Sequence, residues 1–222
     1  MLLAIDIGNT HIVTGILDNN GEVLLTFRVA SVVPNLITIF QFLGKKYFHI
    51  DPMIVGPDIK IPFTFAPNLN PTGFGADRII DIVQSLNDYP DKNLVIFDFG
   101  SATTYEVLEK TVYVGGGILP GIEMSINALF ANTAKLPKVK FSTPESVLGK
   151  NTNEQIQAGI FYGYAGQIKH IIKKIKEVID NPFVVATGGL GKILSAEIEE
   201  IDVYSPDLSI KGLYTLYLHN KK

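Results

Sequence analysis

The sequence predicts an α/β protein built from two similar halves with a cleft between them. The first observation is a short turn that occurs twice, at residues 6–10 and again at 98–104. In each copy an apolar run with the length and β-branched content of a buried strand leads to an Asp, then a Gly two residues on, then hydroxyl or amide side chains. The second observation is that a similar order of strands and helices surrounds each copy. The duplication favours two domains, residues 1–92 and 93–222.

The chemistry of the repeated turn points to phosphate binding. Because Gly has no Cβ, the backbone of such a turn comes close to a ligand. Its N–H groups and a hydroxyl can hold phosphate oxygens, while the Asp can hold a hydrated Mg²⁺. A single Asp-x-Gly is more often an ordinary hairpin turn, so the duplication carries this interpretation. Two such turns facing each other would bracket the phosphate tail of a nucleotide.

Composition excludes several classes of protein. No apolar run approaches the roughly 20 residues of a membrane span, and no basic segment precedes an apolar leader at the N-terminus. The absence of cysteine excludes disulfides and thiol nucleophiles, and four scattered His form no zinc motif. A net charge of −3 argues against a nucleic-acid surface, and the basic run at 169–176 has the spacing of a solvent-facing helix side. We therefore expect a soluble, cytoplasmic protein with no membrane or nucleic-acid partner.

Hydrophobic spacing predicts the same succession of elements in both halves. In the first half we expect strands at 2–6, 11–17 and 23–29, a helix at 36–43, a short buried strand at 53–55, a loop at 61–73 and a helix at 79–86. In the second half we expect two strands within 93–108, a third at 111–114, a Gly-rich segment at 115–121 that leads into a helix at 122–130, a long helix at 153–179, a strand at 183–186, a short helix near 193–198, a strand at 202–204 and a helix at 208–218. This is the order of the ribonuclease H-like domains of the actin/sugar-kinase/Hsp70 fold, which holds ATP in a central cleft.

Within that fold the sequence resembles one family, the type III pantothenate kinases, which make 4′-phosphopantothenate for coenzyme A biosynthesis. The resemblance covers positions 6 to about 190 and follows the family's order. The matching stretches are Asp-Ile-Gly-Asn-Thr at 6–10, Gly-Ala-Asp-Arg at 75–78, Asp-Phe-Gly-Ser-Ala-Thr-Thr at 98–104, the Gly-rich 115–122 with 129–137, and more weakly 151–152 with 157–160.

The resemblance implies an ATP site with two cations. The ATP-binding positions it implies are Asp6, Ile7, Gly8, Asn9, Thr10, His11, Ile12, Val13 and, from the second turn, Ser101. Asp6 would hold Mg²⁺ through water, and Asp98 would bind a monovalent cation such as K⁺ or NH₄⁺.

The resemblance also implies a pantothenate site. Asp77 would act as the general base, and Arg78 would bind the substrate carboxylate with its planar fork of donors. The other substrate-binding positions are Gly75, Ala76, Thr152 and Asn68. Three of these residues have an alternative, purely structural role. Asp77 could be a charge at the start of a helix, Arg78 a surface ion-pair partner, and Thr152 the N-cap of the long helix.

The sequence departs from the family in two respects. The family commonly has a Tyr that contacts pantothenate where this chain has Asn68, so Phe65 or Phe74 could fill that space, or the pocket could be wetter. The chain is also shorter than many relatives around residues 31–60.

Other readings stay open on the sequence alone. A kinase of the same fold acting on another small molecule would keep both turns, and one branch of the family is named for an accessory role in transcription. The presence of Asp6 and Asp77 favours the enzyme over a non-enzymatic regulator. A P-loop kinase is excluded because no Gly-x4-Gly-Lys-Ser/Thr occurs. We also expect a homodimer, because the predicted helix at 153–179 carries small residues that permit close helix approach.

Overall fold

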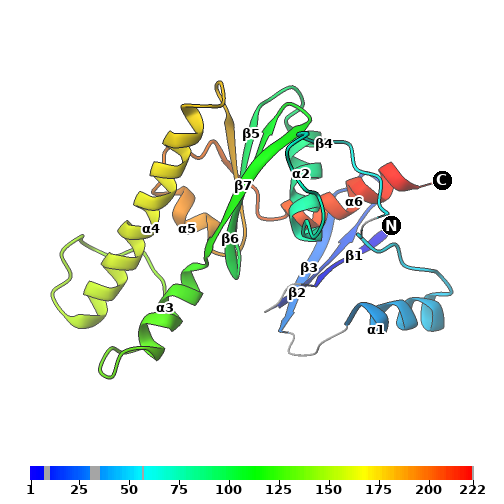
Figure 1. Ribbon diagram of the computed structural model, residues 1–222. Coiled ribbons are helices and arrows are strands. Elements are labelled where there is room, and N and C mark those ends of the chain that lie inside the picture. The colour runs from blue at the N-terminus through cyan, green and yellow to red at the C-terminus, as the bar shows by residue number, and fades with distance from the viewer. Residues whose placement is uncertain (8–10, 31–35, 57, 222) are drawn as a thin grey trace. The chain divides into compact units, whose positions relative to one another are not determined.

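The chain forms two compact units in the computed structural model, which describes residues 1–7, 11–30, 36–56 and 58–221 (Figure 1). The first unit comprises Met1–Phe65, Asn70–Tyr89 and Asp207–Lys222, and the second comprises Ala66–Leu69 and Pro90–Pro206. The division after Tyr89 lies close to the predicted boundary at residue 92. The C-terminal segment, which the sequence analysis assigned to the second half, groups instead with the first unit.

An antiparallel sheet and the C-terminal helix form the core of the first unit. Its strands are β1 (Leu2–Ile7), β2 (His11–Leu17) and β3 (Val23–Ala30), in the order β1-β2-β3, as predicted. Helix α6 (Leu208–Asn220) packs on one face, where Ile210 joins the buried Ala4 and Leu17. Gly15 is required beneath this helix because a Cβ there would collide with the side chain of Ile210.

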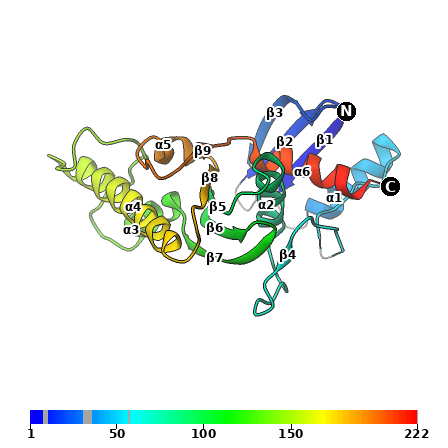
Figure 2. The same ribbon diagram turned by 90° about the horizontal axis from the view of Figure 1, so that it is seen from above.

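Helix α2 (Ala76–Asp88) lies side by side with α6 in the same unit (Figure 2). Two part-buried hydrogen bonds join the helices. The Ser209 hydroxyl donates to Asp81 Oδ1 at 2.8 Å, and the Thr215 hydroxyl donates to Gln84 Oε1 at 2.7 Å. Buried hydrogen bonds of this kind fix one relative position of two helices, because breaking them leaves polar atoms without water.

The segment after β3 is largely exposed. Helix α1 (Leu36–Leu43) has the predicted bounds, but none of its residues is buried, and a single π-helical turn, η1 (Gly44–Phe48), follows it. The predicted buried strand at 53–55 is wrong: these residues form no strand, and Met53 and Ile54 are 40% and 37% exposed. A short apolar run becomes a strand only beside a neighbouring strand that takes its hydrogen bonds. The two-residue strand β4 (Thr64–Phe65) closes this segment.

The second unit contains a mixed sheet. Its strands are β5 (Leu94–Phe99), β6 (Ala102–Glu109), β7 (Val112–Pro120), β8 (Phe183–Thr187) and β9 (Val203–Tyr204). They follow the order β7-β6-β5-β8-β9, with β5 antiparallel to β6 and parallel to β8. β7 is longer than the strand predicted at 111–114, because it continues through the Gly-rich segment to Pro120 with its glycines paired to β6. A Cβ at Gly117 would collide with the Tyr105 ring, so these glycines give that ring room.

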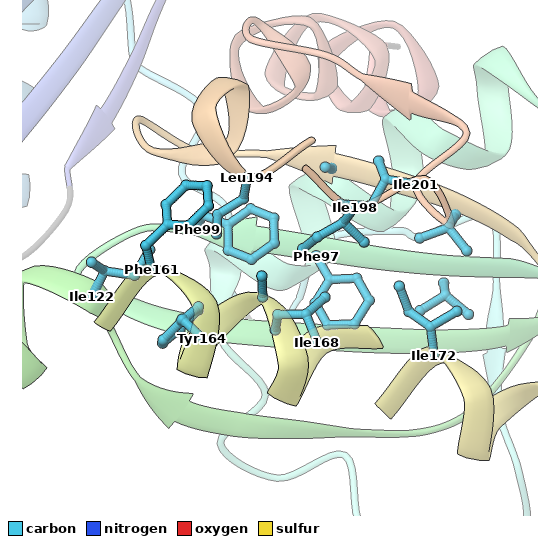
Figure 3. Packing of buried hydrophobic residues seen from close by; sticks show 14 of the residues in the cluster. Phe97, Phe99, Ile122, Phe161, Tyr164, Ile168, Ile172, Leu194, Ile198 and Ile201 are labelled. Atoms are coloured by element: carbon cyan, nitrogen blue, oxygen red, sulfur yellow. The ribbon is translucent and has the colours of Figure 1, made fainter. Parts of the chain in front are cut away.

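Three helices complete the second unit: α3 (Ile122–Ala131), α4 (Thr152–Lys176) and α5 (Gly191–Ser195). Helices α4 and α5 end earlier than predicted, at residues 176 and 195. Phe97 and Phe99 of β5 pack against Ile168 and Ile172 of α4 and against Leu194 of α5 (Figure 3). This core holds the carboxyl end of β5 rigidly. Within the described part of the chain, no helix is long and apolar enough to cross a membrane.

Candidate active site

Two carboxylates lie close together in the first unit. Asp6 is near the end of β1, opposite Val13 of β2, and is partly buried. Burial and, as the smaller cause, the negative charge of Asp77 together raise the pKa of Asp6 from its ordinary 3.8 to about 6. Both causes disfavour the charged form, so a cation at this position would be strongly attracted.

The remaining predicted contacts of the first turn are only partly described. Gly8, Asn9 and Thr10 lie outside the described residues, and of His11 the structure gives only the backbone, which begins β2. Ile7 ends β1, Ile12 is buried, and Val13 packs against the core beneath α6. Ile12 and Val13 therefore have structural roles in the sheet, and their predicted contact with ATP stays a prediction.

The start of α2 presents Asp77 and Arg78 in succession. Gly75 is the N-cap and Ala76 the first helical residue. A Cβ at Gly75 would collide with the Asp77 carboxylate, so the glycine leaves room for this carboxylate to fold back over the helix start. Asp77 is exposed and its Oδ1 accepts a hydrogen bond from the backbone N–H of Arg78 at 2.9 Å. This geometry suits both a helix-start charge and a base directed at a ligand.

Aromatic rings support Arg78. Its guanidinium carbon lies 4.0 Å from the centre of the Phe74 ring, which packs edge-on against Phe65 at 5.2 Å. Stacking on an aromatic face fixes the plane of a guanidinium. Asn68 is exposed and belongs to the second unit. Whether the Phe side chains take the place of the family's Tyr stays a prediction.

The second repeated turn, in the second unit, is closely packed. Asp98 lies near the end of β5, opposite Thr104 and Thr187, and Ser101 is exposed in the turn that follows. Gly188, at φ +88°, crosses over Asp98: a Cβ there would collide with the Asp98 carboxylate and lie 2.6 Å from the backbone N of Phe99. The loop is anchored by the Tyr204 hydroxyl, which donates to the Gly188 carbonyl at 3.1 Å.

The close contact of Gly188 with Asp98 was not expected from the sequence. The available signal was a Gly-Gly pair directly after an apolar strand, at residues 188–189. Because β8 runs parallel to β5, the loops after both strands emerge at the same edge of the sheet. The start of α3 approaches the same turn, since a Cβ at Gly121 would collide with the Ser101 carbonyl.

Thr152 is not the N-cap of α4. That position is taken by Asn151, whose Oδ1 accepts from the backbone N–H of Glu154 at 3.1 Å, while Glu154 accepts from the backbone N–H of Lys150 at 2.8 Å. Thr152 follows as the first helical residue and is exposed. The capping alternative for Thr152 is therefore wrong.

The residues fit metal binding through water rather than a dedicated protein cage. No cluster of three or more His, Asp or Glu side chains able to hold a metal occurs among the residues that the structure describes. Mg²⁺ is commonly held by one or two carboxylates together with waters and substrate phosphates. The partly buried Asp6 beside Asp77 is a donor set of that kind.

Comparison with known proteins places the chain in a family. The family model for type III pantothenate kinases matches residues 22–174. The type III pantothenate kinase of Fusobacterium nucleatum subsp. nucleatum is 60% identical, and the match covers 100% of both chains. The chain belongs to the type III pantothenate kinase family. The alignment runs over 256 positions, whereas this chain has 222 residues, so the Fusobacterium kinase has residues with no counterpart here.

Solved structures confirm the predicted fold. A Campylobacter jejuni protein described as a Baf family transcriptional activator superposes with a TM-score of 0.63 at 20% identity, covering 99% of this chain and 98% of that one. A Clostridium difficile activator of 2-hydroxyisocaproyl-CoA dehydratase, solved with bound ADPNP, gives 0.52 at 15% identity, covering 98% and 92%. A Sinorhizobium meliloti protein described as a 2-dehydro-3-deoxygalactonokinase gives 0.57 at 12% identity, covering 100% and 97%. At these identities the likeness concerns the fold of this type III kinase.

The raised pKa of Asp6 predicts how stability depends on pH. The stability that its protonated form contributes is complete below about pH 4 and is lost as the pH rises through about 6. Asp6→Asn should therefore stabilise the ligand-free protein at pH 7.5, by up to about 3 kcal/mol, and have little effect near pH 4. Urea unfolding of both proteins at the two pH values measures this. Asp58→Asn, at an exposed position, serves as the control. An equal effect of Asp6→Asn at both pH values would contradict the prediction.

Proposed function

We propose that this chain transfers the γ-phosphoryl group of ATP to the hydroxyl of pantothenate, the first step of coenzyme A biosynthesis. Family membership over the whole chain supports this activity. The observation that carries it is the proximity of Asp77 to Asp6, with Arg78 next along the helix. A base, a cation-binding carboxylate and an anion-binding side chain thus come together in one unit.

Phosphoryl transfer needs neutralised phosphate charge, correct positioning and a group to take the hydroxyl proton. We assign the last role to Asp77, which is exposed and held by Gly75 and the Arg78 backbone. Asp6 would hold Mg²⁺ through water, and the metal would neutralise charge on the phosphate oxygens. Residues 8–10 and the Ser101 hydroxyl would bind the phosphates.

Arg78 is the proposed anchor of the pantothenate carboxylate. Its guanidinium is stacked on Phe74 and would meet a carboxylate with two parallel N–H donors. Gly75, Ala76, Thr152 and Asn68 are assigned to the same substrate. Thr152 suits this role because its exposed hydroxyl is not needed to cap α4.

Asp98 is the proposed ligand of a monovalent cation, K⁺ or NH₄⁺. A carboxylate in a turn that faces phosphate oxygens repels them unless a cation lies between. The close approach of Gly188 brings backbone groups beside this carboxylate, and carbonyl oxygens are suitable ligands for such an ion.

A cytoplasmic location belongs to the same proposal, since the substrate pair includes ATP. The direct test is ATP-dependent phosphorylation of pantothenate by the purified protein with Mg²⁺ and K⁺. Phosphorylation of a sugar or another acid but not of pantothenate would favour a kinase of different specificity. A protein that phosphorylates none of these would favour the regulatory alternative.

Substitutions of the two residues at the start of α2 should change different kinetic parameters. Asp77→Asn keeps size and hydrogen bonding but cannot take a proton, so it should lower kcat by about 10²–10⁴ with nearly normal pantothenate affinity. Arg78→Ala should instead raise the KM for pantothenate by about 10–100-fold, because it removes a charged contact made in ground and transition states alike. Steady-state kinetics at saturating ATP distinguish the two.

Asp91→Asn is the matched control, since Asp91 is exposed with φ +66°, a conformation that Asn tolerates. If Asp77→Asn has a kcat near that of the wild type, Asp77 is not the general base and is only a charge at the start of α2.

Asp98→Asn should weaken ATP use and flatten the response to K⁺, because the proposed cation loses its carboxylate ligand. Turnover is measured across a K⁺ series at constant ionic strength, with Na⁺ as the replacement ion. If the wild-type enzyme works equally well in sodium-only buffer, the cation assignment is wrong.

We further propose that the protein is a homodimer joined through α4. Gly159, Gly163 and Gly166 are exposed along this helix, and a Cβ at any of them would meet nothing within 4 Å. Gly inside a helix costs about 1 kcal/mol relative to Ala, and packing within the described chain does not require it here. A helix that approached closely from a second copy would require Gly at these positions.

Gly163→Leu should therefore weaken the dimer, whereas Lys173→Leu, at another exposed position of the helix, should not. Light scattering at micromolar concentration measures both. A wild-type protein with the mass of a single chain would overturn the dimer proposal.

A further inference from the structure

The loop after β8 lies directly on the Asp98 carboxylate. Because β5 and β8 are parallel, with Asp98 opposite Thr187, the next residue, Gly188, comes beside the turn that begins at Asp98. A Cβ added to Gly188 would collide with Asp98 Oδ1 and lie 2.6 Å from the backbone N of Phe99. The position of the Gly188 backbone therefore limits where the Asp98 carboxylate can lie.

The Gly188 carbonyl is held by two donors. The backbone N–H of Gly191 donates to it at 3.1 Å and closes a turn within the loop, and the Tyr204 hydroxyl donates to it at 3.1 Å from another strand. A carbonyl oxygen has two lone pairs, and each of these donors uses one. This oxygen therefore serves to hold the loop, and the bond from Tyr204 ties the loop to the sheet.

Tyr204 is itself fixed in place. It belongs to β9, where it pairs with Ala186 of β8, and the next residue, Ser205, donates its backbone N–H to the Ala186 carbonyl at 2.8 Å. A Cβ on Gly191 would lie 2.6 Å from the Tyr204 ring, so the ring packs closely on the backbone at the start of α5. The ring also packs against the buried core of the second unit. The hydroxyl thus extends from a rigid part of this unit to the loop that lies on Asp98.

We propose that Tyr204 is a positioning residue for Asp98: its hydroxyl holds the Gly188 loop against the carboxylate and so raises the affinity for the proposed monovalent cation. This role rests on the proposed function, which supplies the cation. Tyr204 acts through the Gly188 backbone. When the loop is fixed before binding, the affinity for the ion is not reduced by the cost of ordering it.

The ring and the hydroxyl of Tyr204 have separable roles. Tyr204→Phe keeps the ring, and with it the packing on Gly191 and on the core, and removes only the hydrogen bond to Gly188. Loss of one such bond shifts an equilibrium by about 3- to 10-fold, so the half-saturating K⁺ concentration for turnover should rise by that factor. The kcat at saturating K⁺ should stay near that of the wild type. A variant that had only lost stability would instead have a lower kcat and an unchanged half-saturating K⁺ concentration.

Tyr214→Phe is the matched control. Tyr214 also donates its hydroxyl to a backbone carbonyl, that of Asn19 at 2.7 Å, but this carbonyl belongs to a turn of the first unit. The substitution therefore removes the same kind of hydrogen bond and leaves the Gly188 loop as it is.

Two measurements compare the wild type with both variants. Turnover of pantothenate is followed across a K⁺ series at constant ionic strength, with Na⁺ as the replacement ion. Hydrogen exchange of the ligand-free proteins, followed by mass spectrometry, reports the opening of residues 188–191 and needs no activity. We expect Tyr204→Phe to raise both the half-saturating K⁺ concentration and the exchange rate at 188–191 by about 3- to 10-fold. We expect Tyr214→Phe to change neither.

The outcomes separate this role from the cation assignment. A wild type that responds to K⁺ with the same half-saturating concentration as Tyr204→Phe overturns the role of Tyr204 and leaves the cation assignment in place. A wild type that does not respond to K⁺ overturns the cation assignment and the role of Tyr204 with it. Unchanged exchange at 188–191 in Tyr204→Phe, or equal shifts in both variants, also overturns the role of Tyr204.

Discussion

The site in the first unit depends on one unfavourable arrangement, a partly buried Asp6 carboxylate near the charge of Asp77. Two carboxylates stay close in a folded protein only when the surrounding structure holds them there. In this unit β1 carries Asp6, α2 carries Asp77, and α6 packs against both elements, bonded to α2 through Ser209 and Thr215. The stability of the α2–α6 pair is thus what maintains a position attractive to a cation.

The second turn shows a different way to build the same kind of site. Around Asp98 the main constraint is space, because the Gly188 loop and the start of α3 at Gly121 approach the turn so closely that no side chain fits. The core behind β5 keeps this turn in place. The two Asp-x-Gly motifs therefore differ in the surroundings of their Asp: Asp6 lies near another charge, whereas Asp98 is closely packed by backbone.

The two units are unequal versions of one domain plan. The second has β5 enclosed between neighbours and covered by α4, whereas the described residues of the first form a three-stranded sheet and an apolar helix, α1, with no buried residue. A strand enclosed between two neighbours satisfies its backbone groups within its own chain. The second unit therefore has the more extensive core.

The sequence alone determined the family and most elements, because the motifs at 6–10, 75–78 and 98–104 are local and the helices α2 and α4 follow from residue spacing. It also placed Asp77 and Arg78 together at a helix start. Only the tertiary structure decided that residues 53–55 form no strand, that α6 belongs to the first unit, and that Gly188 lies on Asp98. These features depend on contacts between residues far apart in the chain, and local patterns carry no information about which strand, helix or charge will become a neighbour.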